Sequence, residues 1–386
     1  MDLSFTGEQQ MLRDMVDRYM RERLGPRARP AAQAPGQEWS RQAWRDFAQM
    51  GLLGLPFPEE FGGAGGTPVE TMLVMEALGA GPALEPFFAS VVLAGHAILF
   101  GGSGEQKRAL LPAIASGHHV IVLAHAEPQA RYELADVRTR AVSSGSRWRL
   151  SGSKALVLHG PSARTFIVSA RTSGGPRDAH GISLFLVDAD APGVTVDAYE
   201  TQDGASAADL VLQDVEVPRA SLLGEPGEGL PIVARVADIA IAALAAELVG
   251  CMQAMHDLTL EHLKTREQFG VPLGTFQVLQ HRAVDMLVSL EQARSMAMYA
   301  ATMAGHPDPR VRAAAMSAVK YQVGKAARHV GHQAIQLHGG IGITAECAIG
   351  RYFLRTLVAE TLFGDAPHHL ARLAAYTRAD RLPATA

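Results

Sequence analysis

Helical periodicity, interrupted by glycine and proline, marks the first third of the chain. Residues 8–24 carry apolar side chains at spacings near one helical turn, which predicts an amphipathic helix with its apolar face at Met11, Met15, Met20 and Leu24. Residues 57–66 (FPEEFGGAGG) cannot form regular structure, because proline and clustered glycines break both helix and strand. Helices are then predicted from the N-cap pair Thr67-Pro68 and from the capping-box pattern Ser103–Gln106.

From residue 118 the pattern changes to short runs of β-branched and apolar residues, separated by Gly, Ser, Pro and Asp. This spacing predicts an antiparallel sheet or barrel-like domain. No helical pattern lies between the runs, which argues against a dinucleotide-binding βαβ unit. The predicted strands are residues 120–124, 148–152, 154–160, 165–170, 182–188 and 208–218.

After the glycine-rich segment 224–229 the chain becomes helical. Long helices are predicted at about residues 230–264, 275–304 and 308–337. In the third, apolar residues recur at steps of three and four, and Lys320, Lys325 and Arg328 fall outside that stripe. The predicted fold is α+β, with an N-terminal helical domain (1–117), a central β-sheet domain (118–226) and a C-terminal helical bundle (227–386).

Composition narrows the class of protein. The charges nearly balance, 35 Lys and Arg against 39 Asp and Glu, so we expect no nucleic-acid or membrane partner. The two cysteines, Cys251 and Cys347, suggest neither a disulfide framework nor a zinc cluster. The chain start has no signal pattern, and the apolar stretch 239–251 is interrupted by Glu247 and too short to span a bilayer. We therefore expect a soluble cytoplasmic protein.

Five motifs occur in an order that resembles the acyl-CoA dehydrogenase family, and the similarity extends over the whole chain. They are LGLPFPEEFGG (53–63), DVEVP (214–218), LLGEPGEG (222–229), TREQFG (265–270) and QLHGGIGIT (336–344). Within the family, segments 201–204, 261–274 and 362–370 resemble the small subunit of pimeloyl-CoA dehydrogenase. The resemblance implies a helical N-terminal domain, a β domain and a four-helix bundle, with FAD as cofactor and an acyl-CoA as substrate.

The resemblance places one part of the flavin site in the bundle. In the family, an arginine at a helix end reaches the FAD diphosphate of the neighbouring subunit, and Arg266 fills this position; a guanidinium forms paired, charge-assisted hydrogen bonds with a diphosphate. Phe269 matches an aromatic residue near the adenine. Gln336, Gly339 and Gly340 match a second contact, where absent side chains let the backbone approach the cofactor. The start of the next helix adds Phe276, Gln277 and Gln280.

The part of the flavin site expected in the β domain is altered. Here the family carries Thr-Glu-Pro-Gly-x-Gly-Ser and, later, a Trp-x-Thr strand beside the isoalloxazine ring. This chain has Ala126 for the first threonine, and Leu156 and Leu158 for the tryptophan and threonine. These side chains offer no hydroxyl donor. The pattern indicates a subunit that does not hold its own flavin ring well; the alternative is sequence drift, with backbone N–H groups still serving the ring.

The family's reaction needs a carboxylate that removes the α-proton of an acyl thioester while hydride leaves the β-carbon. Both family positions for this glutamate are apolar here: Phe363 after the Gly-Gly motif, and Ala240 on the helix before Arg266. The remaining candidates are Asp365 and Glu247, the latter on the same helix face about 10 Å further along. Glu247 equally suits a buried, paired carboxylate that joins helices.

Other residue classes suggest no second chemistry. The adjacent histidine pairs 118–119 and 368–369 point in different directions, and neither His-Glu-x-x-His nor Cys-x-x-Cys occurs, so we expect no metal site. The β domain is locally basic, which suits either solvated strand faces or an approach surface for coenzyme A phosphates. The basic residues are Arg131, Arg138, Arg140, Arg147 and Arg149.

Together these features predict one subunit of an FAD-dependent acyl-CoA dehydrogenase, paired with a homologous subunit that carries the catalytic glutamate. The expected assembly is an α2β2 tetramer with fewer FADs than subunits. The expected substrate is a medium-chain or dicarboxylyl-CoA of fatty acid β-oxidation. The alternatives are a self-sufficient homo-oligomeric dehydrogenase with an unusual base, a non-catalytic structural paralogue, and a flavin monooxygenase of the same fold.

Overall fold

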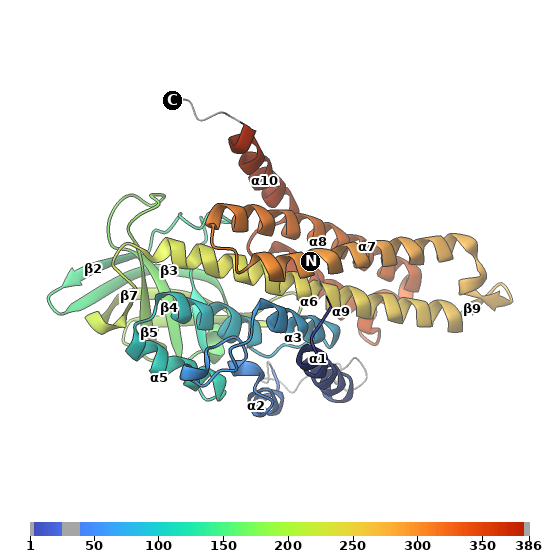
Figure 1. Cartoon of the computed structure of the whole chain (residues 1–386), viewed down its shortest axis with the longest axis horizontal. Coiled ribbons are helices and arrows are strands. Elements are labelled where there is room, and N and C mark those ends of the chain that lie inside the picture. The colour runs from blue at the N-terminus through green and yellow to red at the C-terminus, as the bar shows by residue number, and fades with distance from the viewer. Residues whose placement is uncertain (1–3, 25–38, 382–386) are drawn as a thin grey trace. The chain divides into compact units, whose positions relative to one another are not determined.

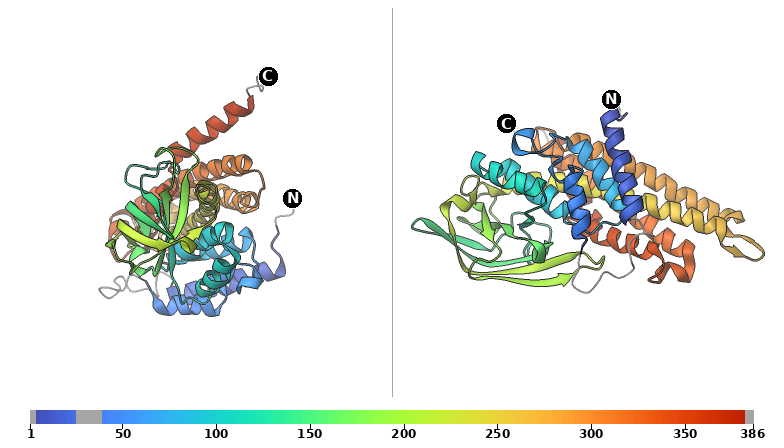
Figure 2. Two further views of the ribbon diagram at one scale, coloured as in Figure 1. Left: turned by 90° about the vertical axis from the view of Figure 1, so that its left-hand side faces the viewer. Right: turned by 90° about the horizontal axis from the view of Figure 1, so that it is seen from below.

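The computed structural model describes residues 4–24 and 39–381. The chain divides into two compact units that interleave along the sequence: Met1–Ala34, Pro68–Ala83 and Ile241–Ala386 form a helical unit, and Pro35–Thr67 and Leu84–Ala240 form a sheet-containing unit. These units follow packing rather than chain order, so the three consecutive domains with boundaries near 118 and 227 stay a prediction. Figures 1 and 2 show the long helices and the strands that dominate the two units.

The helical unit begins with α1 (Gly7–Tyr19), the π-helix η1 (Met20–Leu24) and α3 (Pro68–Ala80). A capping box starts α1, in which the side chains of Thr6 and Gln9 each accept a backbone N–H of the other. The predicted apolar face was half wrong. Its last two positions are buried, but Met11 and Met15 are exposed, because the buried stripe of α1 passes through Val16 instead.

In the sheet-containing unit, several short helical elements precede the strands in the sequence. These are α2 (Arg41–Gln49), η2 (Leu52–Gly54), η3 (Glu59–Phe61), η4 (Phe87–Gly95), α4 (His96–Gly101) and α5 (Gly104–Ala115). The capping box predicted at Ser103 and Gln106 is confirmed at the start of α5. The turn 57–66 contains the 3₁₀ helix η3, so the prediction of no regular structure was wrong there. Its glycines permit close packing: a Cβ on Gly63 would lie 2.0 Å from the Phe57 carbonyl oxygen.

One sheet carries eight strands in the order β6-β7-β3-β2-β4-β5-β8, with β1 beside β4. The strands are β1 (Ile121–Ala124), β2 (Arg140–Ser144), β3 (Arg147–Leu158), β4 (Thr165–Arg171), β5 (Ile182–Asp188), β6 (Val194–Glu200), β7 (Ser206–Pro218) and β8 (Leu222–Leu223), with the 3₁₀ turns η5 (Gly160–Ser162) and η6 (Arg219–Ser221) between them. Most pairings are antiparallel, as predicted, but β1 and β2 run parallel to β4.

Two predicted strands, 148–152 and 154–160, are one continuous strand, β3. Its pairing with β7 shifts register between Leu150 and Gly152 and again between Lys154 and Val157. The break in the sequence pattern therefore corresponds to bulges within a strand rather than to a turn. Strands β2 and β6 were not predicted because most of their side chains are exposed and give no apolar run.

The C-terminal region is helical, as predicted. It contains α6 (Gly229–Thr265), the hairpin β9 (Glu267–Gln268) and β10 (Val271–Pro272), η7 (Leu273–Thr275), α7 (Gln277–Met303), α8 (Pro309–His338), η8 (Gly339–Ile343), α9 (Ala348–Thr361) and α10 (Ala366–Arg381). The first three long helices end close to their predicted limits. Figures 1 and 2 show α7 and α8 side by side, with the hairpin joining α6 to α7. Within residues 4–24 and 39–381 no helix has the length and apolar character needed to cross a membrane.

Lys320 is an exception to the predicted polar face of α8. The predicted apolar stripe is buried, but so is Lys320, which is 1% exposed. Its ammonium donates to the carbonyl oxygens of Ala359 (2.6 Å) and Glu360 (2.9 Å) at the end of α9, where helix geometry leaves carbonyls without intrahelical donors. Burial lowers the pKa of Lys320 to about 7, although the Glu360 and Asp365 carboxylates act in the opposite direction.

Candidate functional site

A tight hairpin after α6 presents an aromatic side chain to solvent. The Arg266 N–H donates to the His262 carbonyl oxygen at 2.9 Å, and the Arg266 carbonyl accepts from Leu273 at 2.8 Å, which closes the loop and leaves the guanidinium exposed. Phe269 and Gly270 form the turn, with φ of 57° and 80°. Phe269 is 90% exposed. Since a bulky residue at positive φ is strained and this ring gains no burial, the chain's own folding does not explain the phenylalanine.

The predicted residues at the start of α7 have two different roles. Phe276 packs edge-on against Phe269, with ring centroids 6.1 Å apart. Gln280 donates its side-chain amide to the Gly274 carbonyl oxygen at 2.8 Å, so it supports the loop. Gln277 is exposed on the first turn. Of these three, Gln277 offers its polar group outward, and Phe276 and Gln280 hold the hairpin in place.

The end of α8 presents bare backbone. Gly339 has a φ of 64° and donates its N–H to the Gln336 carbonyl oxygen, so its positive φ explains this glycine. Gly340 lacks that reason, and a Cβ placed on it would meet no atom within 4 Å. Ile341 and Ile343 beside it are exposed. A glycine with open space around it, next to exposed apolar side chains, fits the approach of a ligand or another chain.

The structure brings these two motifs to one end of the helical unit. His262, on the last turn of α6, stacks on His338, the last residue of α8, with ring centroids 4.5 Å apart and planes 23° from parallel. Neither histidine was predicted to contribute to the site. The signal was present in the sequence, because each lies at most four residues before a predicted flavin contact.

A diphosphate cofactor fits this end of the unit. An exposed guanidinium at Arg266, bare backbone at Gly339 and Gly340, and an exposed ring at Phe269 are the donors and surfaces that a dinucleotide needs. These residues suit only the diphosphate and the adenine of the cofactor. The ring side is expected in the sheet-containing unit.

Two of the ring-side residues in that unit, Ala126 and Leu156, form backbone hydrogen bonds within the chain. The Ala126 carbonyl oxygen accepts the N–H of Ala155 at 2.9 Å. Leu156, at φ 51° in the second bulge of β3, donates its N–H to the Asp209 carboxylate at 3.0 Å. That carboxylate also accepts the Tyr199 hydroxyl at 2.9 Å, and burial, reinforced by this bond, raises the Tyr199 pKa to about 12. The Leu156 N–H, a backbone donor near the missing hydroxyls, is therefore already engaged. Leu158, three residues after Ala155, is half-buried and apolar.

A buried ion pair, which the sequence analysis missed, holds the same loop. The Glu127 carboxylate lies 2.7 Å from the Lys154 ammonium, and both side chains are almost completely buried. The carboxylate also accepts the N–H groups of Arg138 and Thr139 and the amide of Gln129. Burial raises the pKa of Glu127, but Lys154 and these donors outweigh it and lower the pKa to about 2. A lysine at an inward position of an alternating strand was the available signal.

Both family positions for the base are occupied by residues that cannot titrate. Ala240 on α6 is fully buried. Phe363, in the turn between α9 and α10, has a φ of 58°, and its carbonyl oxygen lies 2.9 Å from His369 Nε2. Burial lowers the pKa of His369 to about 3, so this ring is neutral and donates to that carbonyl. No proton acceptor for a substrate lies at either position.

The two remaining candidate acids have structural contacts. Glu247 is 5% exposed and receives two hydrogen bonds from Arg355, at 2.6 and 2.8 Å. Asp365 accepts the backbone N–H of His368 at 2.9 Å, so it caps the first turn of α10. Each carboxylate is thus engaged in joining or starting helices.

The remaining candidate features are a metal site and the basic residues of the β domain. Across the described stretches 4–24 and 39–381, no group of three or more His, Cys, Asp or Glu residues could hold a metal ion. The five β-domain arginines are exposed, and two of them, Arg147 and Arg149, lie 3.9 and 3.6 Å from the Glu216 carboxylate. Exposed pairs of this kind contribute little energy.

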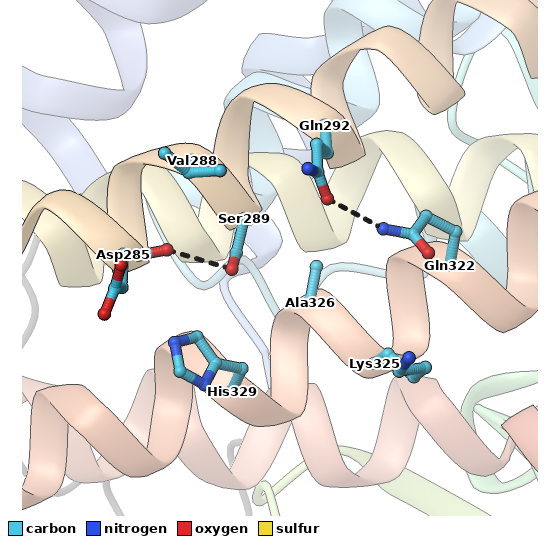
Figure 3. Close-up of a pocket in the computed structure, with 8 residues that line it drawn as sticks. All are labelled: Asp285, Val288, Ser289, Gln292, Gln322, Lys325, Ala326 and His329. Carbon is cyan, nitrogen blue, oxygen red and sulfur yellow. Dashed lines mark hydrogen bonds between the residues drawn. The ribbon is translucent and has the colours of Figure 1, made fainter. Parts of the chain in front are cut away.

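A pocket of about 410 Å³ lies between α7 and α8 (Figure 3). An amide–amide hydrogen bond from Gln322 to Gln292, 3.0 Å long, crosses it. None of the predicted flavin or base residues lines it. The lining residues are Asp285, Val288, Ser289, Gln292, Gln322, Lys325, Ala326 and His329.

Three family models match successive parts of the chain. They describe the N-terminal domain (residues 6–118), the middle domain (122–215) and the C-terminal domain (227–377) of acyl-CoA dehydrogenases. A probable acyl-CoA dehydrogenase, YngJ of Bacillus subtilis, is 32% identical over 378 residues, covering 97% of this chain and 98% of that protein.

Solved structures agree over the full length. The glutaryl-coenzyme A dehydrogenase glutaryl-CoA complex is 27% identical with a TM-score of 0.91, covering 99% of this chain and 98% of that one. The ChsE4-ChsE5 complex from Mycobacterium tuberculosis contains a chain that is 26% identical with a TM-score of 0.87, and each chain is covered completely.

Proposed function

We propose, since this chain belongs to the acyl-CoA dehydrogenase family of FAD-dependent flavoproteins, that it is the base-lacking subunit of a heteromeric acyl-CoA dehydrogenase. A homologous partner subunit supplies the catalytic glutamate. The assembled enzyme introduces a double bond between the α- and β-carbons of an acyl-CoA thioester.

The observation that carries this proposal is the absence of a usable base. The two family positions are Ala240 and Phe363, which cannot accept a proton. Glu247 and Asp365 are engaged, the first by Arg355 and the second by the start of α10. A buried carboxylate whose two oxygens are both held by a guanidinium is not free to turn towards a substrate's α-proton.

This chain's part in catalysis is to bind FAD and to orient it. Arg266 would neutralise the FAD diphosphate through paired hydrogen bonds, and the backbone at Gly339 and Gly340 would lie against the cofactor. Phe269 would cover the adenine side and exclude water there. The chemistry supplied by bound FAD is acceptance of the hydride from the β-carbon. The proton at the α-carbon goes to the partner subunit's glutamate.

The finer parts of the proposal concern assembly, substrate and location. We infer an α2β2 tetramer with fewer FADs than subunits, a cytoplasmic location and a medium-chain or dicarboxylyl-CoA substrate. A similar chain belongs to a complex named for two proteins, ChsE4 and ChsE5, and another to an enzyme with glutaryl-CoA, a dicarboxylyl thioester. Glu247 does not count against a distal carboxylate, since Arg355 balances its charge.

Flavin stoichiometry tests the proposal. The chain is expressed alone and together with a homologous subunit that carries the family glutamate, and FAD per chain is measured from the visible spectrum. We expect little FAD and no enoyl-CoA formation from the chain alone, and about one FAD for two chains with activity in the complex. One FAD per chain in the protein expressed alone, with enoyl-CoA formation, would refute it in favour of a self-sufficient enzyme.

A further inference from the structure

The stacked rings of His262 and His338 lie beside two predicted flavin-binding motifs, residues 265–270 and residues 336–340. We call these the two flavin-facing motifs. The His262 carbonyl oxygen accepts the Arg266 N–H, so this residue anchors the hairpin. On the other side η8 folds back over His338: a Cβ on Gly342 would lie 3.0 Å from the His338 Cβ. A change in the stack would therefore move the hairpin and η8 relative to each other.

Hydrogen bonding favours one protonation state for the stack. His338 Nδ1 lies 2.8 Å from the Ala334 carbonyl oxygen, which can only accept, so Nδ1 carries the proton and Nε2 is unprotonated in the neutral ring. Adding a proton at Nε2 creates a positive charge against the face of His262. Both rings are partly buried, so solvent screens that charge incompletely.

We propose that His262 and His338 are positioning residues that, when neutral, stack and hold the two flavin-facing motifs in one arrangement, and that their protonation separates the motifs and weakens FAD retention. The inference rests on the proposed function, because FAD is the ligand that both motifs would share.

The charges around the stack determine the direction of this effect. Burial, followed by the charges of His338 and Arg266, lowers the pKa of His262. Burial also lowers the pKa of His338, against the bond to Ala334. In the segment after η8, a hydrogen bond from its own backbone N–H, followed by one from the Thr344 side chain, lowers the pKa of the Glu346 carboxyl. The pair is therefore neutral at neutral pH, and protonation at acid pH puts two like charges face to face beside Arg266.

The test on the assembled enzyme measures FAD retention against pH. Free flavin is quantified by fluorescence after desalting the complex between about pH 7.5 and pH 5. We expect the dissociation constant of FAD to rise about tenfold over this range. H262F/H338F keeps two stackable rings without a titrating nitrogen, so its FAD retention should not depend on acid. H332F, whose histidine lies on α8 against Phe353 instead, should keep the wild-type response.

Two further outcomes separate this inference from the proposed function. Wild-type retention that does not change with pH, or that increases in acid through attraction of the diphosphate, overturns the positioning role, as does an unchanged acid loss in H262F/H338F. A complex that holds no FAD at any pH overturns the proposed function. In the isolated chain, NMR titration should show a higher His262 pKa in H338F than in the wild type; identical values would show that the rings do not interact.

Discussion

Two regions that the family uses to hold flavin differ here in how far they are satisfied within the chain. At the end of the helical unit, Arg266, Phe269 and Gly340 have exposed or open surroundings that internal packing does not explain. At the ring side of the sheet-containing unit, Glu127 is paired with Lys154 and the Leu156 N–H is bonded to Asp209. The first region exposes its groups to solvent, and the named polar groups of the second bond within the chain.

This difference explains why the substitutions fall on one side. A surface that contacts another subunit's cofactor must keep its donors, whatever happens to the chemistry in its own subunit. Under the proposed function, a loop released from holding a flavin ring can lose hydroxyl side chains, as at Ala126 and Leu158, provided that its buried polar groups stay paired.

The largest expected effect is that of E127Q, which tests whether the Glu127–Lys154 pair stabilises the loop after Ala126. Removing one partner of a buried pair leaves the Lys154 charge uncompensated, so the free energy of unfolding should fall by about 3–5 kcal/mol. Chemical denaturation of the isolated chain measures it. The double variant E127Q/K154M removes both charges at similar volume and should recover most of the loss. If E127Q is as stable as the wild type, the pair does not hold the loop.

The same pair predicts an acid limb of stability. The folded pKa of Glu127, about 2, lies below its ordinary value of 4.5. Its contribution is therefore fully present above pH 4.5 and is lost as the pH falls towards 2. The difference in unfolding free energy between wild type and E127Q should shrink over this range, and a constant difference would contradict the assignment.

The second test asks whether Glu247 is a base or a structural partner. E247Q leaves the largely buried Arg355 without its carboxylate, and the unfolding free energy should fall by about 3 kcal/mol. Flavin reduction by acyl-CoA in the complex should persist per bound FAD, and E247Q/R355M should recover stability. D365N is the matched variant, since asparagine caps a helix as well as aspartate does. Loss of flavin reduction with FAD still bound, in either variant, would support a self-sufficient enzyme.

The sequence predicted the positions of the long helices well, because their buried residues recur with the helical period. The limits of α6, α7 and α8 follow from apolar stripes and breaks. The strand prediction missed β2 and β6, because most of their side chains are exposed and form no apolar pattern. It divided β3 in two, because a bulge interrupts the strand pattern as a turn would. The helical pattern also misplaced Lys320, because a lysine that caps carbonyls of a distant helix looks in sequence like any solvent-facing lysine.

For the candidate site, the sequence could give residue types but not their partners. The motifs around Arg266 and Gly340 were recognisable because they are contiguous. The Glu127–Lys154 pair spans 27 residues and the His262–His338 stack joins two helix ends, so local signals could mark single residues but not which residue each one contacts. The partners of Glu247 and Asp365 likewise became visible only through packing.

The third test breaks the outward-facing region. R266A should leave the isolated chain as stable as the wild type, because this guanidinium is exposed, but should weaken FAD binding by the complex. Loss of a charge-assisted, paired hydrogen bond of about 1.5–3 kcal/mol corresponds to a ten- to hundredfold rise in the dissociation constant. K264A, which removes a neighbouring exposed charge, should have little effect. If R266A dissociates the complex without changing flavin retention, the chain is a structural paralogue.

The smallest expected effect is on FAD affinity, when hydroxyl side chains are restored at the positions that the family uses beside the flavin ring. A126T/L158T restores two hydroxyl donors at the family positions, and we expect FAD affinity of the isolated chain to increase by about 1 kcal/mol, or about fivefold, measured by flavin fluorescence titration. The gain is small because the Leu156 N–H stays bonded to Asp209 and the half-buried Leu158 site must repack. A126V/L158V has the same shape without hydroxyls and separates hydrogen bonding from packing. Equal affinity in the threonine and valine variants would mean that the missing hydroxyls do not limit FAD binding by the isolated chain.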